Sequence, residues 1–466
     1  MKKFFSVLMV LLLSLTLISC KKNDGGGGGG DNPGPNPGPN PGPIGKPTEI
    51  VIMHGAIHEI DPRHPNYSGR EQAAKIKLHE EVEEELNVKI KYESYPADAP
   101  WGPARQGKII EWHAAGQAKA DIYWIPTIWL GEIVDAGAVV PIDDWLKTHG
   151  KNINTDVLDL TLYKGKTWGF MPEPITGEKG LFYNTALIEA AGLEDPVDLW
   201  NRGEWTWDRF ASYAEEANTK LQSVSEENKV LGSYPSVWAE SLIPLNGGAI
   251  VDLESESVTF TQSAAMQTYE YLEDLYKKGL FETSPNYDSG SDAYANGNVL
   301  FHPGHLWFVR AENRWGQFDF VKEGNIGVVP FPLPAGKSKD DYRIPVGEEA
   351  IYTVASNPKD RSKEELAFEV WNRIQLWESE EEFGDSFRDS LIKTFDDSKH
   401  VDVYMEIYNK IYFDIHGQLG IGAYSQNAWQ IRVNTGIKDG TTRTELNSII
   451  DVYREALNKF LGKDSE

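Results

Sequence analysis

The sequence predicts a mixed α/β protein with two lobes, on the evidence of its length, its composition and the order of its first elements. The segment from Thr48 to Glu466 exceeds the usual size of a single domain. Hydrophobic residues make up 40% of the chain and charged residues 25%, which allows a large core. Strand and helix patterns alternate from Thr48 to Ile125, and this order is typical of a parallel α/β sheet.

Residues 1–19 have the features of a secretory signal peptide. Two lysines precede an apolar run from Phe4 to Ile18, and Cys20 is the only cysteine of the chain. The run is shorter than the roughly 20 residues that cross a bilayer comfortably. It resembles a bacterial lipoprotein signal, in which cleavage before Cys20 leaves that cysteine to be lipidated. The alternative is an ordinary signal peptide followed by an incidental cysteine.

Residues 20–47 are predicted to be a flexible linker behind the lipidated cysteine. Six glycines, Gly25–Gly30, precede a Pro-Gly-Asn repeat that ends near Pro47. Such a segment offers few apolar groups and few backbone donors, so it is expected to stay extended and solvated. A folded domain tethered near a membrane is the expectation.

The first folded part contains well-marked helix and strand patterns. Apolar residues at four-residue spacing (Ala74, Leu78, Val82 and Leu86) predict a helix over 70–86. We expect strands at 49–53, 88–92 and 120–125, a long loop over 94–108, and helices over 109–118 and 129–136.

Later segments have local signals of turns and helix starts. Lys164 and Gly165 indicate a turn between short strands. Thr206 is a good N-cap, with Trp205 placed to pack on Phe210 as a hydrophobic staple. Further expectations are a strand at 181–183, a capping box over Ser362–Glu365 that opens a helix, and helices over 265–280 and 446–461.

The charge balance excludes some partners. The formal net charge is −26, which argues against nucleic acid and against adhesion to anionic lipid, because both require basic surface. With one cysteine the chain has no disulfide of its own, so its stability depends on core packing.

The sequence contains no convincing catalytic motif. It has neither a Gly-x-Ser-x-Gly elbow nor a phosphate-binding glycine loop. His54, His58 and His64 lie near Glu59 and Asp61, but the intervening prolines set no fixed ligand spacing. We therefore expect no enzyme activity, no metal and no cofactor, although 71 acidic residues leave a glycosidase-like carboxylate pair open.

Several of the 15 tryptophans stand in polar segments rich in glycine and proline: Trp101, Trp129, Trp168, Trp238, Trp307 and Trp429. A tryptophan in such a loop-like context is a candidate platform for stacking a ligand. Core or rim packing is the competing interpretation for each of them.

Eight segments occur in a recognisable order. They are Asp121–Ile125 with Asp135–Trp145, Gly165–Pro172, Leu181–Gly192, Trp205–Phe210, Leu275–Leu280, Asn296–Gly304, Val329–Gly336 and Gly347–Val354. Together they resemble the extracellular solute-binding proteins of bacterial ABC importers, family 1, the group that contains maltose-binding protein. The stretches His54–Ser68 and Ser94–Lys108 are longer than that pattern, which affects the expected ligand more than the expected fold.

The resemblance implies a periplasmic-binding-protein fold of type II, with three hinge crossings and a ligand cleft between two α/β lobes. The first lobe is expected to comprise 48–171 and 332–378, and the second 172–331 and 379–466. The implied function is capture of a sugar or oligosaccharide by closure of the cleft and its delivery to the permease subunits of an ABC importer. Alternatives are the same fold binding a peptide or a polyamine, and a surface-anchored glycan hydrolase.

The resemblance also implies which residues contact the ligand. They are Trp129, Glu173, Trp238, His305, Trp307, Glu348 and Trp429, followed with less support by Asp61 and Trp101. A neutral sugar presents an apolar face and a rim of hydroxyls, which suits flat aromatic rings joined by a few carboxylates. The protein is expected to be a monomer, anchored by lipid to the outer face of the cytoplasmic membrane of a bacterium.

Overall fold

A four-stranded sheet contains the first three strands of the chain. The computed structural model describes residues 45–463, so the expected signal peptide, Cys20 and most of the linker lie outside the described residues. The strands are β1 (Thr48–His54), β2 (Val88–Ser94), β3 (Ile122–Pro126) and β13 (Ala350–Val354), in the order β13-β3-β1-β2. β1 runs parallel to β2 and to β3, whereas β13 is antiparallel to β3. The carboxyl ends of β1, β2 and β3 therefore share one edge.

A second four-stranded sheet forms from the middle of the chain. Its strands are β6 (Lys179–Asn184), β7 (Lys229–Leu231), β10 (Val299–His305) and β11 (Ile326–Val329), in the order β11-β6-β10-β7. β6 is antiparallel to β10, and the register pairs Lys179 with His305. The start of β6 and the end of β10 therefore lie at the same edge of this sheet.

A short parallel pair, β12 (Ile344–Val346) with β14 (Ile411–Phe413), connects two distant parts of the chain. The expected first-lobe segment 332–378 is divided as a result. Leu333 bridges Thr206 and β12 pairs with β14, whereas β13 belongs to the first sheet. The two remaining strand pairs are hairpins: β4 (Leu162–Tyr163) with β5 (Lys166–Thr167), and β8 (Val251–Asp252) with β9 (Ser257–Val258).

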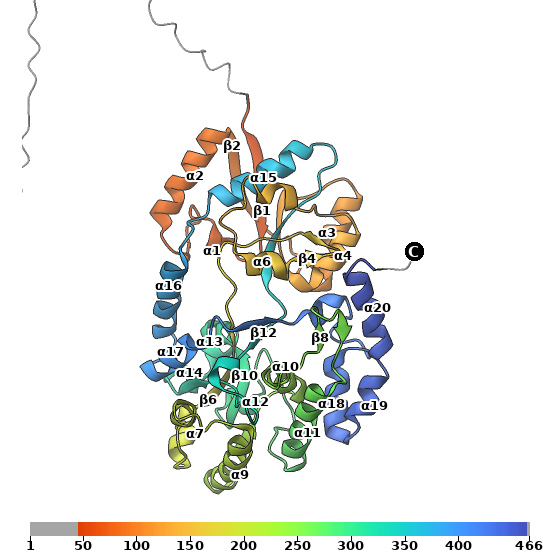
Figure 1. The fold of residues 1–466 in the computed structure, drawn as a ribbon. Helices are drawn as coiled ribbons and strands as arrows, with labels where there is room; N and C mark the ends of the chain where they lie inside the picture. Colours follow the sequence, from red (N-terminus) through yellow and green to blue (C-terminus); the bar gives the residue numbers. More distant parts are fainter. Residues whose placement is uncertain (1–44, 464–466) are drawn as a thin grey trace, which may run out of the picture. The chain divides into compact units, whose positions relative to one another are not determined.

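Helices cover both sheets (Figure 1). Against the first sheet and its surroundings lie α1 (Ile57–Ile60), α2 (Gln72–Leu86), α3 (Pro103–Ala114), α4 (Leu130–Asp135), α5 (Asp143–Leu146), α6 (Thr155–Leu160) and α15 (Arg361–Arg373). Those that follow β6 are α7 (Thr185–Ala190), α8 (Pro196–Asn201), α9 (Trp207–Val224), α10 (Pro235–Leu245), α11 (Ser263–Lys277), α12 (Asp292–Ala295), α13 (Leu306–Arg310) and α14 (Asp319–Lys322).

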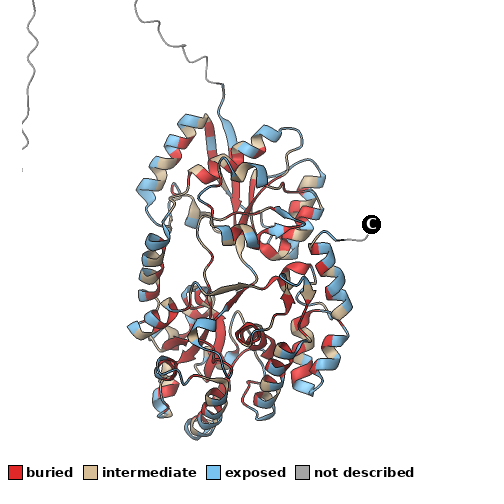
Figure 2. Cartoon of the chain, in the orientation of Figure 1, coloured by how far each residue is buried: buried red, intermediate tan, exposed pale blue. Residues whose placement is uncertain are grey.

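The C-terminal part adds α16 (Glu380–Ile392), α17 (Ser398–Met405), α18 (Trp429–Asp439), α19 (Thr442–Asn447) and α20 (Ile450–Phe460). Four 3-10 turns complete the elements: η1 (Thr127–Trp129), η2 (Trp315–Gln317), η3 (Lys339–Asp341) and η4 (Ile415–Leu419). Figure 2 shows most strand residues of the second sheet and of the inner strands of the first sheet as buried, and the outer faces of the helices as exposed. Within residues 45–463, no helix combines the length and the apolarity that a membrane crossing requires.

Three local expectations are confirmed. The turn between β4 and β5 has Lys164 and Gly165 at φ 49° and 68°, in the left-handed region that suits a tight hairpin. Thr206 caps α9 by accepting a hydrogen bond from the Arg209 amide. The Trp205 ring meets the Phe210 ring edge-on with centroids 5.3 Å apart, as expected for a hydrophobic staple.

Three local expectations are wrong. The segment 94–108 is not a loop throughout, because α3 begins at Pro103, where a helix tolerates proline in its first turn. The Ser362 capping box does not form: Asp360 caps α15, and Ser362 donates to the Asp360 carboxylate. His79 lies on the buried face of α2 in place of Ala74, and its Nε2 is 2.6 Å from the Tyr92 hydroxyl.

Candidate functional site

The shared edge of β1, β2 and β3 carries a group of aromatic rings. Trp101, just before α3, is 51% exposed, and its ring centroid lies 4.9 Å from that of Trp129 and 5.4 Å from that of Trp124. Trp129 is itself only 6% exposed. The Trp129 ring thus packs against the Trp101 ring, and of these two rings it is Trp101 that is exposed to solvent. Strand ends of parallel sheets are the usual place for ligands.

Arg105 lies beneath these rings, in the first turn of α3. Its side chain is buried, and its guanidinium is 4.0 Å from the centroid of the Tyr95 ring and 5.3 Å from that of Trp101. The Nε atom donates to the carbonyl of Ala99 at 3.1 Å. Burial lowers the pKa of Arg105, because desolvation disfavours the charged form.

The corresponding edge of the second sheet carries Lys179, His305 and Trp307. Trp307 is 42% exposed and packs edge-on against Phe308, with the Arg314 guanidinium 5.5 Å from its ring centroid. Burial, followed by the nearby charge of Lys179, lowers the pKa of His305 to about 3, so its imidazole is neutral at pH 7. This edge thus pairs a half-exposed indole with a neutral imidazole.

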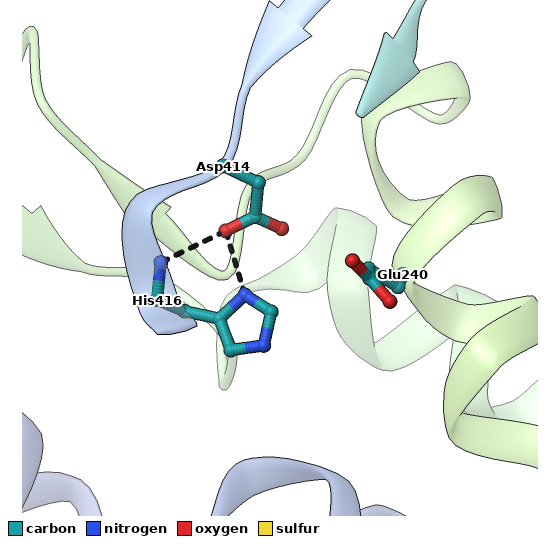
Figure 3. A group of neighbouring side chains, drawn as sticks. All are labelled: Glu240, Asp414 and His416. Atoms are coloured by element: carbon teal, nitrogen blue, oxygen red, sulfur yellow. Dashed lines mark hydrogen bonds and ion pairs between the residues drawn. The ribbon is translucent and has the colours of Figure 1, made fainter. Parts of the chain in front are cut away.

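A charged group lies where the start of β6 meets α10 and η4. The buried Lys179 places its Nζ 2.8 Å from Oε2 of Glu240. Asp414 accepts hydrogen bonds on Oδ1 from the amide of His416 at 3.2 Å and from the ring Nδ1 of His416 at 2.8 Å. Figure 3 shows Glu240 facing this Asp414–His416 pair.

The Asp414–His416 pair is electrostatically coupled. Burial opposes ionisation of Asp414, but the adjacent His416 brings the Asp414 pKa below its ordinary value. Burial also opposes protonation of His416, but Asp414 raises the His416 pKa above its ordinary value. Glu240, Asp414 and His416 offer ligand atoms within 4.8 Å of one another, which could hold a metal ion. The ammonium of Lys179 already supplies a positive charge to this group.

Two further carboxyls stand on the short link between β12 and β13. Glu348 is reached by solvent, yet the surrounding protein and Glu240 raise its pKa. Burial, with the neighbouring Glu178 and Glu348, raises the pKa of Glu349 to about 8. Glu178 also has a raised pKa, because burial outweighs the effect of Arg310. Glu349 is therefore largely neutral at pH 7 until a donor reaches it.

Backbone contacts connect the two edges through this link. The amide of Thr127 donates to the carbonyl of Glu349, and the amide of Glu349 donates to the Thr127 hydroxyl. Gln418 donates to the carbonyl of Gly347 at 3.3 Å. A polar strip consisting of Thr127, Gly347–Glu349, Asp414, His416, Glu240 and Lys179 thus extends from the Trp101 edge to the Trp307 edge.

Two of the expected ligand-binding tryptophans have no accessible face. Trp238 is 0% exposed, its indole N–H donates to the carbonyl of Gly232, and its ring packs edge-on against Phe331. Trp429 is 1% exposed and donates to the hydroxyl of Tyr269. The expectation that they stack on a ligand is contradicted, because each ring is enclosed by core side chains.

The remaining expected residues lie apart from the strip. The exposed Glu173 is 3.5 Å from the guanidinium of Arg70. Asp61 accepts from the amide of Arg63 and lies in a shallow hollow with the strand Lys89–Glu93, on another part of the first sheet. His54 is buried against Trp124, and its Nδ1 accepts from the Ala56 amide, so it does not form one group with His58 and His64.

Sequence reasoning missed Lys179, Glu240, Asp414, His416 and Arg105. Lys179, Glu240 and the Asp414–His416 pair stand on three elements that are far apart in the chain, so no spacing rule could group them. Arg105 was assigned to a loop because α3 was expected to begin later. A usable signal was present in Pro103, since proline is favoured in the first turn of a helix.

Comparison with known proteins supports the same architecture. The chain is similar to the GacH receptor of Streptomyces glaucescens, whose structures include complexes with acarbose, at 17% identity, covering 89% of this chain and 99% of that chain with a TM-score of 0.55. It is also similar to a cyclic alpha-maltosyl-1,6-maltose binding protein from Arthrobacter globiformis, at 13% identity, 90% and 100% coverage and a TM-score of 0.58. A third match is UgpB from Mycobacterium tuberculosis in complex with glycerophosphocholine, at 13% identity, 89% and 99% coverage and a TM-score of 0.55.

These likenesses show the two-lobed α/β fold of periplasmic binding proteins. The model of the bacterial extracellular solute-binding protein family matches residues 68–370, which is more than half of the chain. The chain therefore belongs to the bacterial extracellular solute-binding proteins.

Proposed function

We propose that this protein captures a saccharide between its two lobes and delivers it to the permease of an ABC importer. The observation that carries the proposal is the pair of half-exposed tryptophans, Trp101 and Trp307, each at the strand-end edge of a different sheet. An indole face matches the apolar face of a pyranose ring. Two such platforms on opposite lobes suit a ligand that is held from both sides.

The polar strip supplies the second requirement of a sugar site. Lys179 and the ring N–H of His416 are donors, Glu240 and Asp414 are acceptors, and neutral Glu349 can act as either. Saccharide hydroxyls also act as both donors and acceptors, so a strip of mixed polarity can pair with them. Because these side chains are already ordered by one another, little side-chain entropy is lost on binding.

We assign the lobes by the sheet that each segment joins. The first lobe then comprises 48–171 with 350–373, and the second comprises 179–346 with 380–463. Three crossings connect them, at 172–178, 347–349 and 374–379. This assignment rests on strand pairing, and on the packing of α15 against the first sheet and of Phe383 with Phe182 in one apolar cluster. Closure about these crossings would bring Trp101 and Trp307 toward one ligand.

We further propose that the protein acts as an extracellular monomer, tethered by a lipid on Cys20 to the outer face of the cytoplasmic membrane, and that it has no enzymatic activity. The sequence pattern of residues 1–47 supports the tether. Metabolic labelling with a palmitate analogue, compared between the wild-type chain and Cys20→Ser, tests it. Labelling of the Cys20→Ser chain, or no labelling of either, would exclude the anchor.

The binding proposal is tested by titrating neutral and acidic oligosaccharides while following tryptophan fluorescence, calorimetry and the radius of gyration by X-ray scattering. A binding saccharide should reduce the radius of gyration, because the lobes close on it. Trp307→Ala should lose affinity, while Trp145→Ala, in α5 with its ring against Phe368, serves as the matched control. Folded protein that responds to no saccharide would reject the proposal.

A non-sugar solute is the second candidate. The charges in the strip favour it, because a solute with a charged group could pair with Lys179 or with Glu348. A polyamine and a short peptide therefore belong in the same titration. A response to one of these in the absence of any saccharide response would replace the sugar proposal.

A further inference from the structure

Arg105 is a buried cation without an anion. Its side chain is 8% exposed, and its Nη1 atom is buried without a hydrogen-bond partner. The one hydrogen bond found for its guanidinium is from Nε to the carbonyl of Ala99. Burial lowers the pKa of Arg105, and no carboxylate among residues 45–463 raises it again. Buried charges are normally paired, because desolvation of an isolated ion is unfavourable.

The aromatic rings do not replace an anion. Tyr95 and Trp101 lie against the guanidinium at 4.0 and 5.3 Å, and the Tyr95 ring is held in place because its hydroxyl donates to the carbonyl of Trp124 at 2.8 Å. A stacked ring interacts with the face of a guanidinium, whereas the N–H donors point outward in its plane. The rings thus orient the guanidinium and leave Nη1 without an acceptor.

A glycine lies beside this nitrogen. Gly55, directly after β1, is exposed, and a Cβ built on it would lie 3.6 Å from Nη1 of Arg105 and 2.9 Å from the Trp124 ring. Any side chain at position 55 would therefore occupy the approach to Nη1. Nη1 itself is enclosed in this structure, so an acceptor atom of a ligand would contact the guanidinium at Nη2, for which no hydrogen bond is found among the described residues, and would reach Nη1 only after the neighbouring rings shift.

Two other cations of the candidate site show the contrast. Arg314 lies near the ring of the second exposed tryptophan, Trp307, at 5.5 Å, but its Nε is 2.9 Å from Oδ1 of Asp288. Lys179 is buried and is paired with Glu240. The two arginine–tryptophan pairs are thus similar in stacking and differ in charge compensation. Nη2 of Arg314 donates to Oδ2 of Asp288 at 3.2 Å, whereas no carboxylate of the described residues pairs with Arg105.

We infer that the ligand bears an anionic substituent, a carboxylate or a sulfate on a sugar ring, which pairs with Arg105 while the ring stacks on Trp101. This inference rests on the proposed saccharide-binding function and specifies its substrate class as an acidic saccharide. A planar guanidinium recognises both groups through paired N–H donors. The net charge of −26 does not oppose such a ligand at short range, because salt screens distant charges within about 10 Å.

Matched pairs of saccharides test the inference by calorimetry on the purified protein. The carboxylate pair is trigalacturonate and its methyl ester, and the sulfate pair is neocarrabiose 4-sulfate and its desulfated form. In at least one pair the charged member should bind at least tenfold more tightly. Arg105→Gln should remove that preference while changing the affinity for the neutral member less than threefold. Arg63→Gln, which removes a charge paired with Glu83 elsewhere on the same lobe, should keep the preference.

A stability measurement separates a ligand-binding role of Arg105 from a structural one. Thermal unfolding of unliganded Arg105→Met should show a midpoint equal to or above that of the wild type, because the substitution removes an unpaired buried charge. A decrease of more than about 5 °C would assign Arg105 to packing and overturn the inference.

The outcomes also distinguish this inference from the function on which it rests. If neutral and charged members bind equally, or if Arg105→Gln weakens both equally, the acidic-saccharide inference is wrong and saccharide binding stands. If no saccharide binds to the folded protein, the proposed function fails, and this inference fails with it.

Discussion

Nζ of Lys179 lies 2.8 Å from Oε2 of Glu240, and the lysine side chain is only 4% exposed. The pair joins the first residue of β6 to α10. The ammonium stands among acidic groups, since Asp414 and Glu348 lie near the same two residues. This ion pair therefore holds β6 against α10 within the polar strip.

Lys179→Met is expected to reduce the free energy of unfolding by about 1–3 kcal/mol, because it leaves the Glu240 carboxylate near other acids without a counter-ion. Glu240 is partly exposed, which keeps the loss below that of a fully buried pair. Urea unfolding measures the loss. Lys166→Met, at an exposed position of the β4–β5 hairpin, is the control. The double variant Lys179→Met with Glu240→Leu should recover most of the stability, and a double variant as unstable as Lys179→Met alone would contradict the account.

Trp238→Ala is expected to lower stability, whereas Trp101→Ala is expected to weaken saccharide binding. The fully buried Trp238 fills the core, so its removal should cost about 3–5 kcal/mol of unfolding free energy. Trp101 is half exposed, so its removal should change stability by less than about 1 kcal/mol and weaken saccharide binding about 10- to 100-fold. Unfolding and calorimetry on both variants check this. Equal affinity of Trp101→Ala and the wild type would exclude Trp101 from the site.

Glu349 should make stability fall as the pH rises. Its pKa is about 8 in the folded protein and near 4.5 in the unfolded chain. Between these values the folded state binds more protons than the unfolded state, so the free energy of unfolding decreases from about pH 4.5 to about pH 8. Glu349→Gln cannot ionise, and it should gain about 1–3 kcal/mol over the wild type at pH 8.5 and nothing at pH 4.

Denaturant unfolding at the two pH values tests this expectation. Glu84→Gln, on the exposed face of α2, is the control and should follow the wild type at both. A Glu349→Gln chain with the same pH dependence as the wild type would show that Glu349 is not held neutral.

Gly347→Ala should disturb the link between β12 and β13. A Cβ at this position would lie 2.7 Å from the carbonyl oxygen of Asp414, which is backbone and cannot swing aside. We expect a loss of about 1–3 kcal/mol and a smaller ligand-induced decrease in the radius of gyration. Gly107→Ala is the control. Gly107 is exposed on α3, and a Cβ there would meet nothing within 4 Å, so this variant should gain about 0.5–1 kcal/mol of unfolding free energy.

Local patterns were sufficient for the elements whose signals are contained within a few residues. The Thr206 cap, the Trp205–Phe210 staple and the Lys164–Gly165 turn depend on neighbours along the chain, and all three are confirmed. The cap of α15 is assigned wrongly from the sequence because Asp360 and Ser362 are both favourable N-cap residues two positions apart, and the sequence alone does not rank them.

The candidate site was only partly predictable. Trp101 and Trp307 were named from their polar surroundings, and both are exposed. Trp238 and Trp429 have similar surroundings, yet they are buried, because α10 and α18 pack against α11. Whether a tryptophan faces solvent depends on which distant helix covers it, and residue spacing does not encode that.

The sequence by itself determined the α/β class, the family, and the expectation of a tethered binding protein, because periodicity, composition and ordered motifs are local properties that accumulate along the chain. Only the tertiary structure decided that Lys179, Glu240 and His416 form one charged group and that Arg105 is buried without an anion. The physical reason is that desolvation and Coulomb energies depend on distances between segments separated by tens to hundreds of residues, and these distances exist only after the sheets have formed.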